Sequence, residues 1–222
     1  MKRTALTLFI ALVFVLGTTA VSFASTTAFT FPETKTTKIN EKVKHKVSTK
    51  KYIKTKKIKA KTRTLGEKKV VLGGTTYTFA VKERIPAHKV KTYRSAKKLS
   101  KKTWQVKKGK TDTAKGKVMI EKPSVKGYAL RTTHTQKTTS VSGMSKIPIP
   151  KGKTKVANSE TKKTVEKANV TYKKLNDRSF AVTYAIPCKN SVFTQKTKQK
   201  RCEETSTRTM ITHTYTLTYT KR

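Results

Sequence analysis

Apolar and polar residues alternate one by one through much of this chain. The clearest example is the C-terminal segment MITHTYTLTYTKR, in which a threonine occupies every even position from Thr212 to Thr220. Successive side chains of a strand point to opposite faces of a sheet. We therefore expect the threonines to face solvent or another threonine-rich strand, and the residues between them to face a core: Ile211, Tyr215, Leu217 and Tyr219.

The same period of two recurs upstream. In KVKHKV, valines and a histidine alternate with lysines, and KKIKAKTRT repeats the pattern. Similar runs at 70–84, 87–95, 103–109, 116–122, 127–135, 145–156, 168–175 and 179–186 are separated by glycine and proline, which mark turns. This pattern predicts an all-β fold of antiparallel, sandwich-like sheets built from short Thr/Lys-rich strands. A helix over residues 158–170 is the alternative, which its threonines and valines disfavour.

The first residues have the three regions of a secretory signal peptide. Lys2 and Arg3 precede an apolar run from Ala5 to Leu16, and small residues lead to Ala24. We expect cleavage after Ala24; an uncleaved anchor is the alternative. The expected organisation is a signal peptide at 1–24, a basic N-terminal strand segment at 25–66 in which partial disorder is left open, and a β domain at 67–222. The protein is thus expected to be secreted, and charge could retain it at a cell surface.

Positive charge dominates the composition. The chain has 53 lysines and arginines against 11 aspartates and glutamates, a net charge of +42, which becomes +40 once residues 1–24 are removed. Such a charge attracts polyanions and also opposes a compact state. Only nine of the basic residues are arginine. Lysine is a hydrated point charge, so the bias favours diffuse attraction over base-specific readout of nucleic acid.

The chain has two cysteines, Cys188 and Cys202. In an exported protein an isolated pair most simply forms a disulfide. We therefore expect a Cys188–Cys202 bridge at the base of a C-terminal hairpin whose tip, KNSVFTQKTKQKR, is a solvated basic connection.

Clusters of lysine interleaved with apolar and aromatic residues carry the strongest functional signal. They predict binding of an anionic polymer (cell-wall polymer, acidic polysaccharide or nucleic acid) or of an anionic lipid surface, driven by release of counterions. Trp104, inside one cluster, is expected to anchor a core rather than stack on a ligand. The predicted binding residues are Lys42, Lys44, Lys46, Lys57, Lys59, Lys61, Arg63, Lys101, Lys102, Lys107 and Lys108.

No catalytic or metal-binding spacing is recognisable, and the sequence predicts neither an enzyme nor a cofactor. A secreted ribonuclease that uses His134 and His213 for acid–base chemistry is an alternative, but no spacing or partner singles these residues out. Ice binding by the threonine ladder would need several ladders side by side, and only one strand displays the pattern cleanly.

One segment carries a family resemblance. Ser/Thr-rich amphipathic sequence followed by IPIPKGKTKV, over Arg131 to Val156, resembles the membrane-insertion and following strands of aerolysin-type β-pore-forming toxins. This resemblance implies a membrane-damaging β-pore-forming or antimicrobial protein, which is the alternative function.

Overall fold

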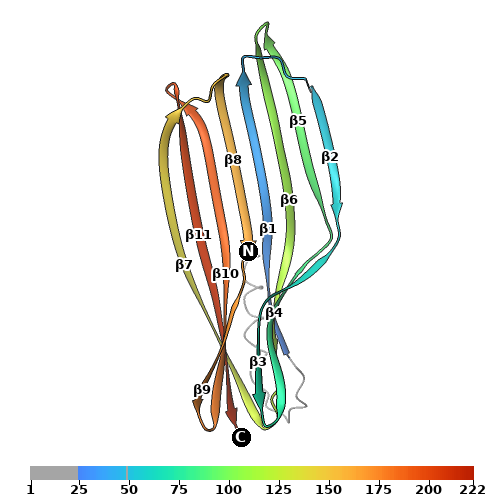
Figure 1. Cartoon of the computed structure of the whole chain (residues 1–222), viewed down its shortest axis with the longest axis vertical. Helices are drawn as coiled ribbons and strands as arrows, with labels where there is room; N and C mark the ends of the chain where they lie inside the picture. The colour runs from blue at the N-terminus through green and yellow to red at the C-terminus, as the bar shows by residue number, and fades with distance from the viewer. Residues whose placement is uncertain (1–24, 49) are drawn as a thin grey trace, which may run out of the picture.

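The computed structural model describes residues 25–48 and 50–222, so the expected signal peptide lies outside the described residues. The described part contains eleven strands and no helix, and the all-β prediction is confirmed. No helix in these ranges is long and apolar enough to cross a membrane. The strands are β1 (Ser25–Val43), β2 (Lys51–Ile58), β3 (Lys61–Leu72), β4 (Thr75–Ile85), β5 (His88–Ser100), β6 (Thr103–Lys122), β7 (Tyr128–Pro148), β8 (Lys153–Val165), β9 (Asn169–Asn176), β10 (Ser179–Lys198) and β11 (Arg201–Lys221) (Figure 1).

The strands are longer than expected. Five of them contain 19 to 21 residues, whereas about 5–6 is usual. The prediction of short strands was wrong because several glycines that it placed in turns, such as Gly109, Gly116 and Gly143, lie inside strands. The helix alternative over 158–170 is also wrong, because β8 continues to Val165.

All strand pairs are antiparallel, as predicted, but the eleven strands form one open sheet and not the expected set of sandwich-like sheets. Its main order is β2-β5-β6-β1-β8-β10-β11-β7. β3 pairs with β4, β4 also pairs with β6, and β9 pairs with β10. The strands run along the long axis of the molecule (Figure 1). β1, the first described strand, lies in the middle of this order, between β6 and β8.

The main core lies at the end of the molecule that carries the C-terminus (Figure 1). β8 ends at Val165, and below it two groups of strands face each other: β1, β3, β4 and β6 against β9, β10 and β11. The rings of Phe79 and Tyr219 meet edge to face with centroids 5.9 Å apart. The hydroxyl of Tyr184 donates a hydrogen bond to the carbonyl oxygen of Glu121 at 2.7 Å. Burial of these aromatic side chains provides most of the apolar packing that holds the two groups together.

The two groups of strands present opposite faces of the same sheet to this core. In the open part, Thr113 of β6 and Asn190 of β10 lie on one face, because β1 and β8 connect them in continuous register. Nearer the C-terminus the buried residues are Ile120 and Tyr184. Ile120 lies on the other face of β6 from Thr113, whereas Tyr184 lies on the same face of β10 as Asn190. All strands twist in the same right-handed sense, so both groups rotate in the same direction about the long axis as they separate. One group therefore turns its front face, and the other its back face, toward the core between them.

The C-terminal ladder has the predicted orientation. Tyr215, Leu217 and Tyr219 are buried, while Thr216 faces outward. Thr216 is aligned with threonines of its neighbours, and its hydroxyl lies 3.3 Å from that of Thr183. The aligned row crosses four strands: Thr171, Thr183, Thr216 and Thr133.

The predicted disulfide is contradicted. Cys188 is aligned with Ile211 and Cys202 with Thr197, and both thiols are buried without a bridge. Cys188 and Thr197 are nine residues apart on β10, which corresponds to roughly 30 Å along a strand. The expected loop between the cysteines instead continues as paired strands, and the chain reverses only at Gln199 and Lys200, both with positive φ.

Candidate polyanion-binding surface

Four connections between strands meet at the end of the molecule opposite the C-terminus (Figure 1). We call the described residues 44–48, 50–51, 97–102, 150–155 and 196–201 the cationic end. Val43, which precedes the first segment, is aligned with Trp104 and with Lys153. The Lys44 amide donates a hydrogen bond to the Gly152 carbonyl at 3.1 Å. The chain order therefore brings together lysine clusters that are far apart in the sequence.

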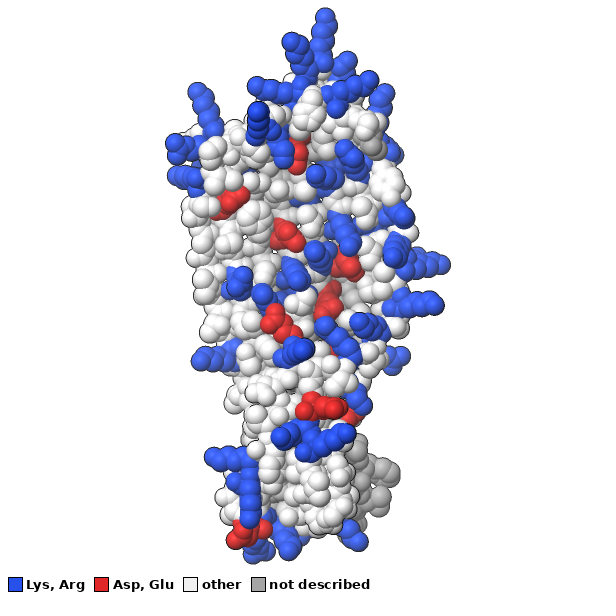
Figure 2. All heavy atoms as spheres, viewed as in Figure 1, with Lys and Arg blue, Asp and Glu red and all other residues white. Residues whose placement is uncertain are grey.

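The cationic end has no acidic residue in its four segments, and basic side chains project from it (Figure 2). Nearby acids pair with two of its lysines: Glu203 lies 3.5 Å from Lys198, and Glu41 lies 3.3 Å from Lys153. The other cations of this end form no ion pair within residues 25–48 and 50–222. Its fifteen basic residues are Lys44, Lys46, Lys50, Lys51, Lys97, Lys98, Lys101, Lys102, Lys151, Lys153, Lys155, Lys196, Lys198, Lys200 and Arg201.

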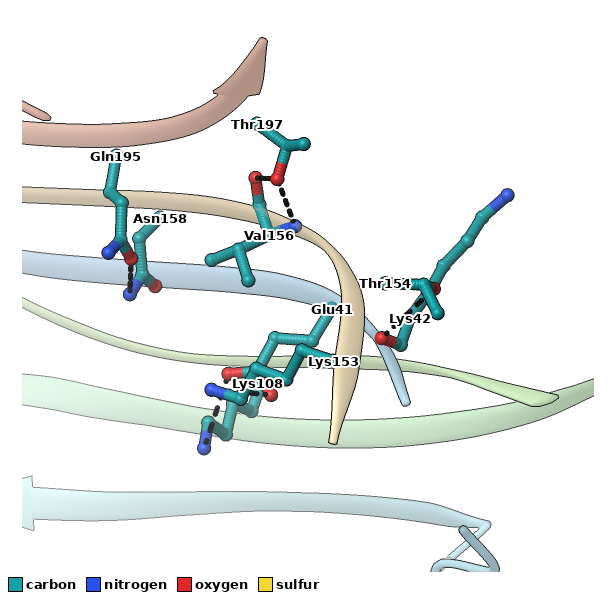
Figure 3. A network of polar contacts seen from close by, with 9 residues as sticks. All are labelled: Glu41, Lys42, Lys108, Lys153, Thr154, Val156, Asn158, Gln195 and Thr197. Carbon is teal, nitrogen blue, oxygen red and sulfur yellow. Dashed lines mark hydrogen bonds and ion pairs between the residues drawn. The ribbon is translucent and has the colours of Figure 1, made fainter. Parts of the chain in front are cut away.

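Polar contacts fix the connections to the strands beneath them (Figure 3). The carboxylate of Glu41 is buried, with the Lys153 and Lys108 ammonium groups at 3.3 and 3.9 Å. The Thr197 hydroxyl accepts a hydrogen bond from the Val156 amide at 2.8 Å. These contacts hold β1, β6, β8 and β10 in place, so the lysines extend from an ordered base.

A small apolar cluster lies beneath the cationic end. Val43, Trp104 and Val106 are buried together, with Val47 and Ala96 packed against them. Trp104 is only 8% exposed, which confirms its prediction as a core anchor.

The predicted binding residues fall into separate places. Five lie at or beside the cationic end: Lys42, Lys44, Lys46, Lys101 and Lys102. Lys107 and Lys108 follow a few residues along β6, on opposite faces of the sheet. Lys57, Lys59 and Lys61 surround the junction of β2 and β3, roughly 40 Å from the β5–β6 turn by strand rise.

Arg63 occupies a different environment. Its guanidinium pairs with Glu83, contacts Glu33 at 2.8 Å and donates a hydrogen bond to the Val165 carbonyl at 3.0 Å. Glu83 is fully buried, and this burial raises its pKa above the usual range. Arg63 therefore compensates a buried charge, and we leave it out of the candidate surface.

Other cations of this end were missed at the sequence level. Lys151, Lys153 and Lys155 belong to IPIPKGKTKV, and Lys196 to Arg201 form the hairpin tip that was interpreted as a solvated connection. The alternating pattern continues through the tip, but no residue there marks the turn at Gln199 and Lys200. Only strand order could have shown that this tip joins the other three connections.

The histidines of the ribonuclease alternative lie elsewhere. His134 and His213 contact each other on the β7–β11 pair. His213 is twelve residues from Arg201 along β11, or roughly 40 Å from the cationic end. Burial first, and then the proximity of His134, lower the pKa of His213.

No family model matches this chain, and comparison with curated proteins and with solved structures also finds no match. Within the described ranges, no three or more His, Cys, Asp or Glu residues are grouped so that they could hold a metal ion. The functional argument therefore depends on the arrangement of charge and surface.

Proposed function

We propose that this protein binds an anionic polymer or an anionic surface through its cationic end and does so without catalysis. The observation that carries the proposal is that four connections at one end of the molecule hold fifteen cations and no acidic residue of their own, so that only the two lysines paired with Glu41 and Glu203 are compensated among the described residues. Cations held this close together repel one another, and a polyanion relieves this repulsion while releasing its own counterions.

The residue types support a charge-based mechanism. Fourteen of the fifteen cations are lysines, which act as point charges and do not form the bidentate contacts of arginine. The partner is then chosen by its charge density, and affinity falls steeply with salt. Because residues 1–24 are expected to be a signal peptide, we propose that the protein acts outside the cell, where anionic polymers occur on surfaces.

The test measures binding of heparin and of duplex DNA between 50 and 300 mM salt. One variant carries Lys→Gln at Lys101, Lys102, Lys198 and Lys200. A matched control carries the same charge change at four exposed lysines near the other end: Lys68, Lys69, Lys126 and Lys173. The slope of log K against log salt should decrease by up to about 0.9 per lysine removed in the first variant. It should change little in the control.

Equal losses in both variants would mean that net charge alone attracts the polymer, and the cationic end would not be the site. No binding at low salt would rule out the proposal.

A second candidate function rests on β7. Residues 129–146 of this edge strand are all exposed, and they combine many hydroxyl side chains with the exposed apolar residues Val141 and Met144. Within residues 25–48 and 50–222, β7 pairs with β11 alone, and a long edge of this kind suits rearrangement or pairing with another strand. As the alternative, we propose membrane damage by this strand. Leakage of dye from anionic liposomes would support it, whereas binding without leakage would favour the polyanion function.

A further inference from the structure

One face of the open sheet contains a groove that the cationic end does not include. It has a volume of about 630 Å³, and its lining residues come from β1, β2, β5, β6 and β8. Ile39 of β1 lines it, and Tyr52 of β2 forms part of its wall. Tyr52 is 43% exposed, so much of its ring is available to a ligand. The groove thus has an apolar part that could pack against a ring.

Cations surround this apolar part. Lys35, Lys108 and Lys110 point to the same face as Tyr52, because they occupy alternating positions of strands in continuous register. Glu160 is the one acid that lines the groove. Lys108 also approaches Glu41 at 3.9 Å. Lys35 and Lys110 form no ion pair with any described residue, so the groove retains an excess of positive charge.

Arg94 gives the groove a directed donor. It lies on β5 among the lining residues, and its buried Nε atom has no hydrogen-bond partner within the described ranges. A buried donor without an acceptor destabilises the folded protein. A sulfate, phosphate or carboxylate would supply the missing acceptor, and guanidinium binds such groups with defined geometry.

We infer that this groove binds one acidic sugar unit of an anionic polysaccharide. The ring of the sugar packs on Tyr52, and its anionic group accepts a hydrogen bond from Arg94, the residue aligned with Tyr52, on the side toward Lys110. Nucleic acid is a poorer fit, because single strands are bound through several aromatic side chains that stack successive bases. Tyr93 also lines the groove, but its position on β5 directs its side chain to the other face of the sheet, so Tyr52 is the lining aromatic residue on this face.

This inference rests on the proposed function and gives it a substrate class. Lys108 is five residues along β6 from Thr103, where the cationic end adjoins the strand, so the groove lies roughly 17 Å from that end. A flexible polymer can occupy both places. Two linked contacts raise the overall affinity well above that of either one.

The experiment titrates the whole mature chain with a heparin-derived tetrasaccharide and follows binding by calorimetry. Arg94→Lys preserves charge but removes the Nε donor, and Arg84→Lys on β4 is its control. Tyr52→Ala removes the ring, and Ile53→Ala, an exposed neighbour on the opposite face, is its control. Arg94→Lys and Tyr52→Ala should each weaken binding at least fivefold, while both controls stay within twofold. Circular dichroism checks that each variant is folded.

A second readout needs no substitution. The tetrasaccharide should protect Lys35 and Lys110 from acetylation more than Lys68 and Lys69, as measured by mass spectrometry. If long heparin binds but the tetrasaccharide neither binds nor protects these lysines, the groove assignment fails and the proposed function stands. If neither binds, both fail. Stronger Arg94-dependent binding of an oligothymidylate of equal charge would overturn the choice of a sugar.

Discussion

The Nε2 atom of His134 in β7 lies 3.3 Å from the Nδ1 atom of His213 in β11. The two rings are nearly parallel, with an interplanar angle of 12°, and Phe29 covers His213 with ring centroids 4.7 Å apart. At this separation one ring nitrogen can donate a hydrogen bond to the other. Burial first, and then the adjacent His134, disfavour a positive charge on His213 and lower its pKa.

Acid should weaken the folded protein through this pair. The pKa of His213 is lowered in the fold, so below about pH 6.5 the unfolded chain binds a proton that the folded chain resists. The stabilisation is fully present above pH 6.5 and is lost as the pH falls below it. Urea unfolding at pH 7.5 and 5.5 should show this loss, and His213→Gln should reduce it. His45→Gln, at an exposed residue, is the control, and equal pH dependence in all three proteins would contradict the prediction.

Two glycines in long strands should respond differently to alanine. A Cβ atom at Gly109 would lie 2.6 Å from the Tyr93 ring and 2.7 Å from the Thr37 carbonyl oxygen. At Gly143 it would meet only the Ser206 hydroxyl at 3.5 Å. Gly109→Ala should therefore lower the free energy of unfolding by about 1–3 kcal/mol. Gly143→Ala should leave it unchanged or raise it slightly. Denaturant unfolding measures both, and similar values for the two would show that the close contacts at Gly109 relax.

Removing the partner of Glu83 should be costly. Arg63→Met leaves a buried carboxylate without its guanidinium, and we expect a loss of about 3 kcal/mol, at the low end for buried pairs because Arg63 is partly exposed. Arg84→Met, at an exposed arginine of β4, should have little effect. Adding Glu83→Met to Arg63→Met should recover part of the loss. If the double variant is less stable than Arg63→Met alone, the ion pair is not the source of the effect.

Both cysteines should remain reduced in the folded protein. Burial raises the pKa of the Cys188 thiol to about 12, so iodoacetamide should label it slowly until the chain unfolds. In guanidinium without reductant, mass spectrometry should show two adducts, and the melting temperature should be the same with and without dithiothreitol. A mass two daltons lower than the reduced chain, with no labelling, would instead indicate a disulfide.

Local alternation was enough to predict the strand character, because side-chain direction in a strand depends only on parity. The same reasoning placed Tyr215, Leu217 and Tyr219 in the core. It failed at Cys188 and Cys202, because the position of a turn depends on pairing over many residues. The residues KTKQKR fit an exposed loop and also fit two paired strands that end in a tight turn at Gln199 and Lys200, and the sequence does not distinguish these structures.

The sequence predicted some lysines of the candidate site but not which of them lie together. Lys101 and Lys102 stand out in the sequence, but their neighbours at the cationic end come from three other connections. Arg63 fits the alternating pattern of its segment as well as any lysine, and only the burial of Glu83 separates it. The sequence around Arg94 does not mark it as a binding residue, because the lack of a hydrogen-bond partner for its Nε atom depends on how the folded chain packs.

β1 lies in the middle of the sheet, between two strands that are synthesised after it. Its two edges pair with residues 104–122 and 153–163. A chain made from its N-terminus therefore carries β1 without its complete β6 neighbour until residue 122, and without its β8 neighbour until residue 163, has been synthesised. Such non-local pairing forms slowly. The pairing of β1 therefore has to wait for distant strands, whereas β10 and β11 can pair across the tight turn at Gln199 and Lys200 as soon as both are made.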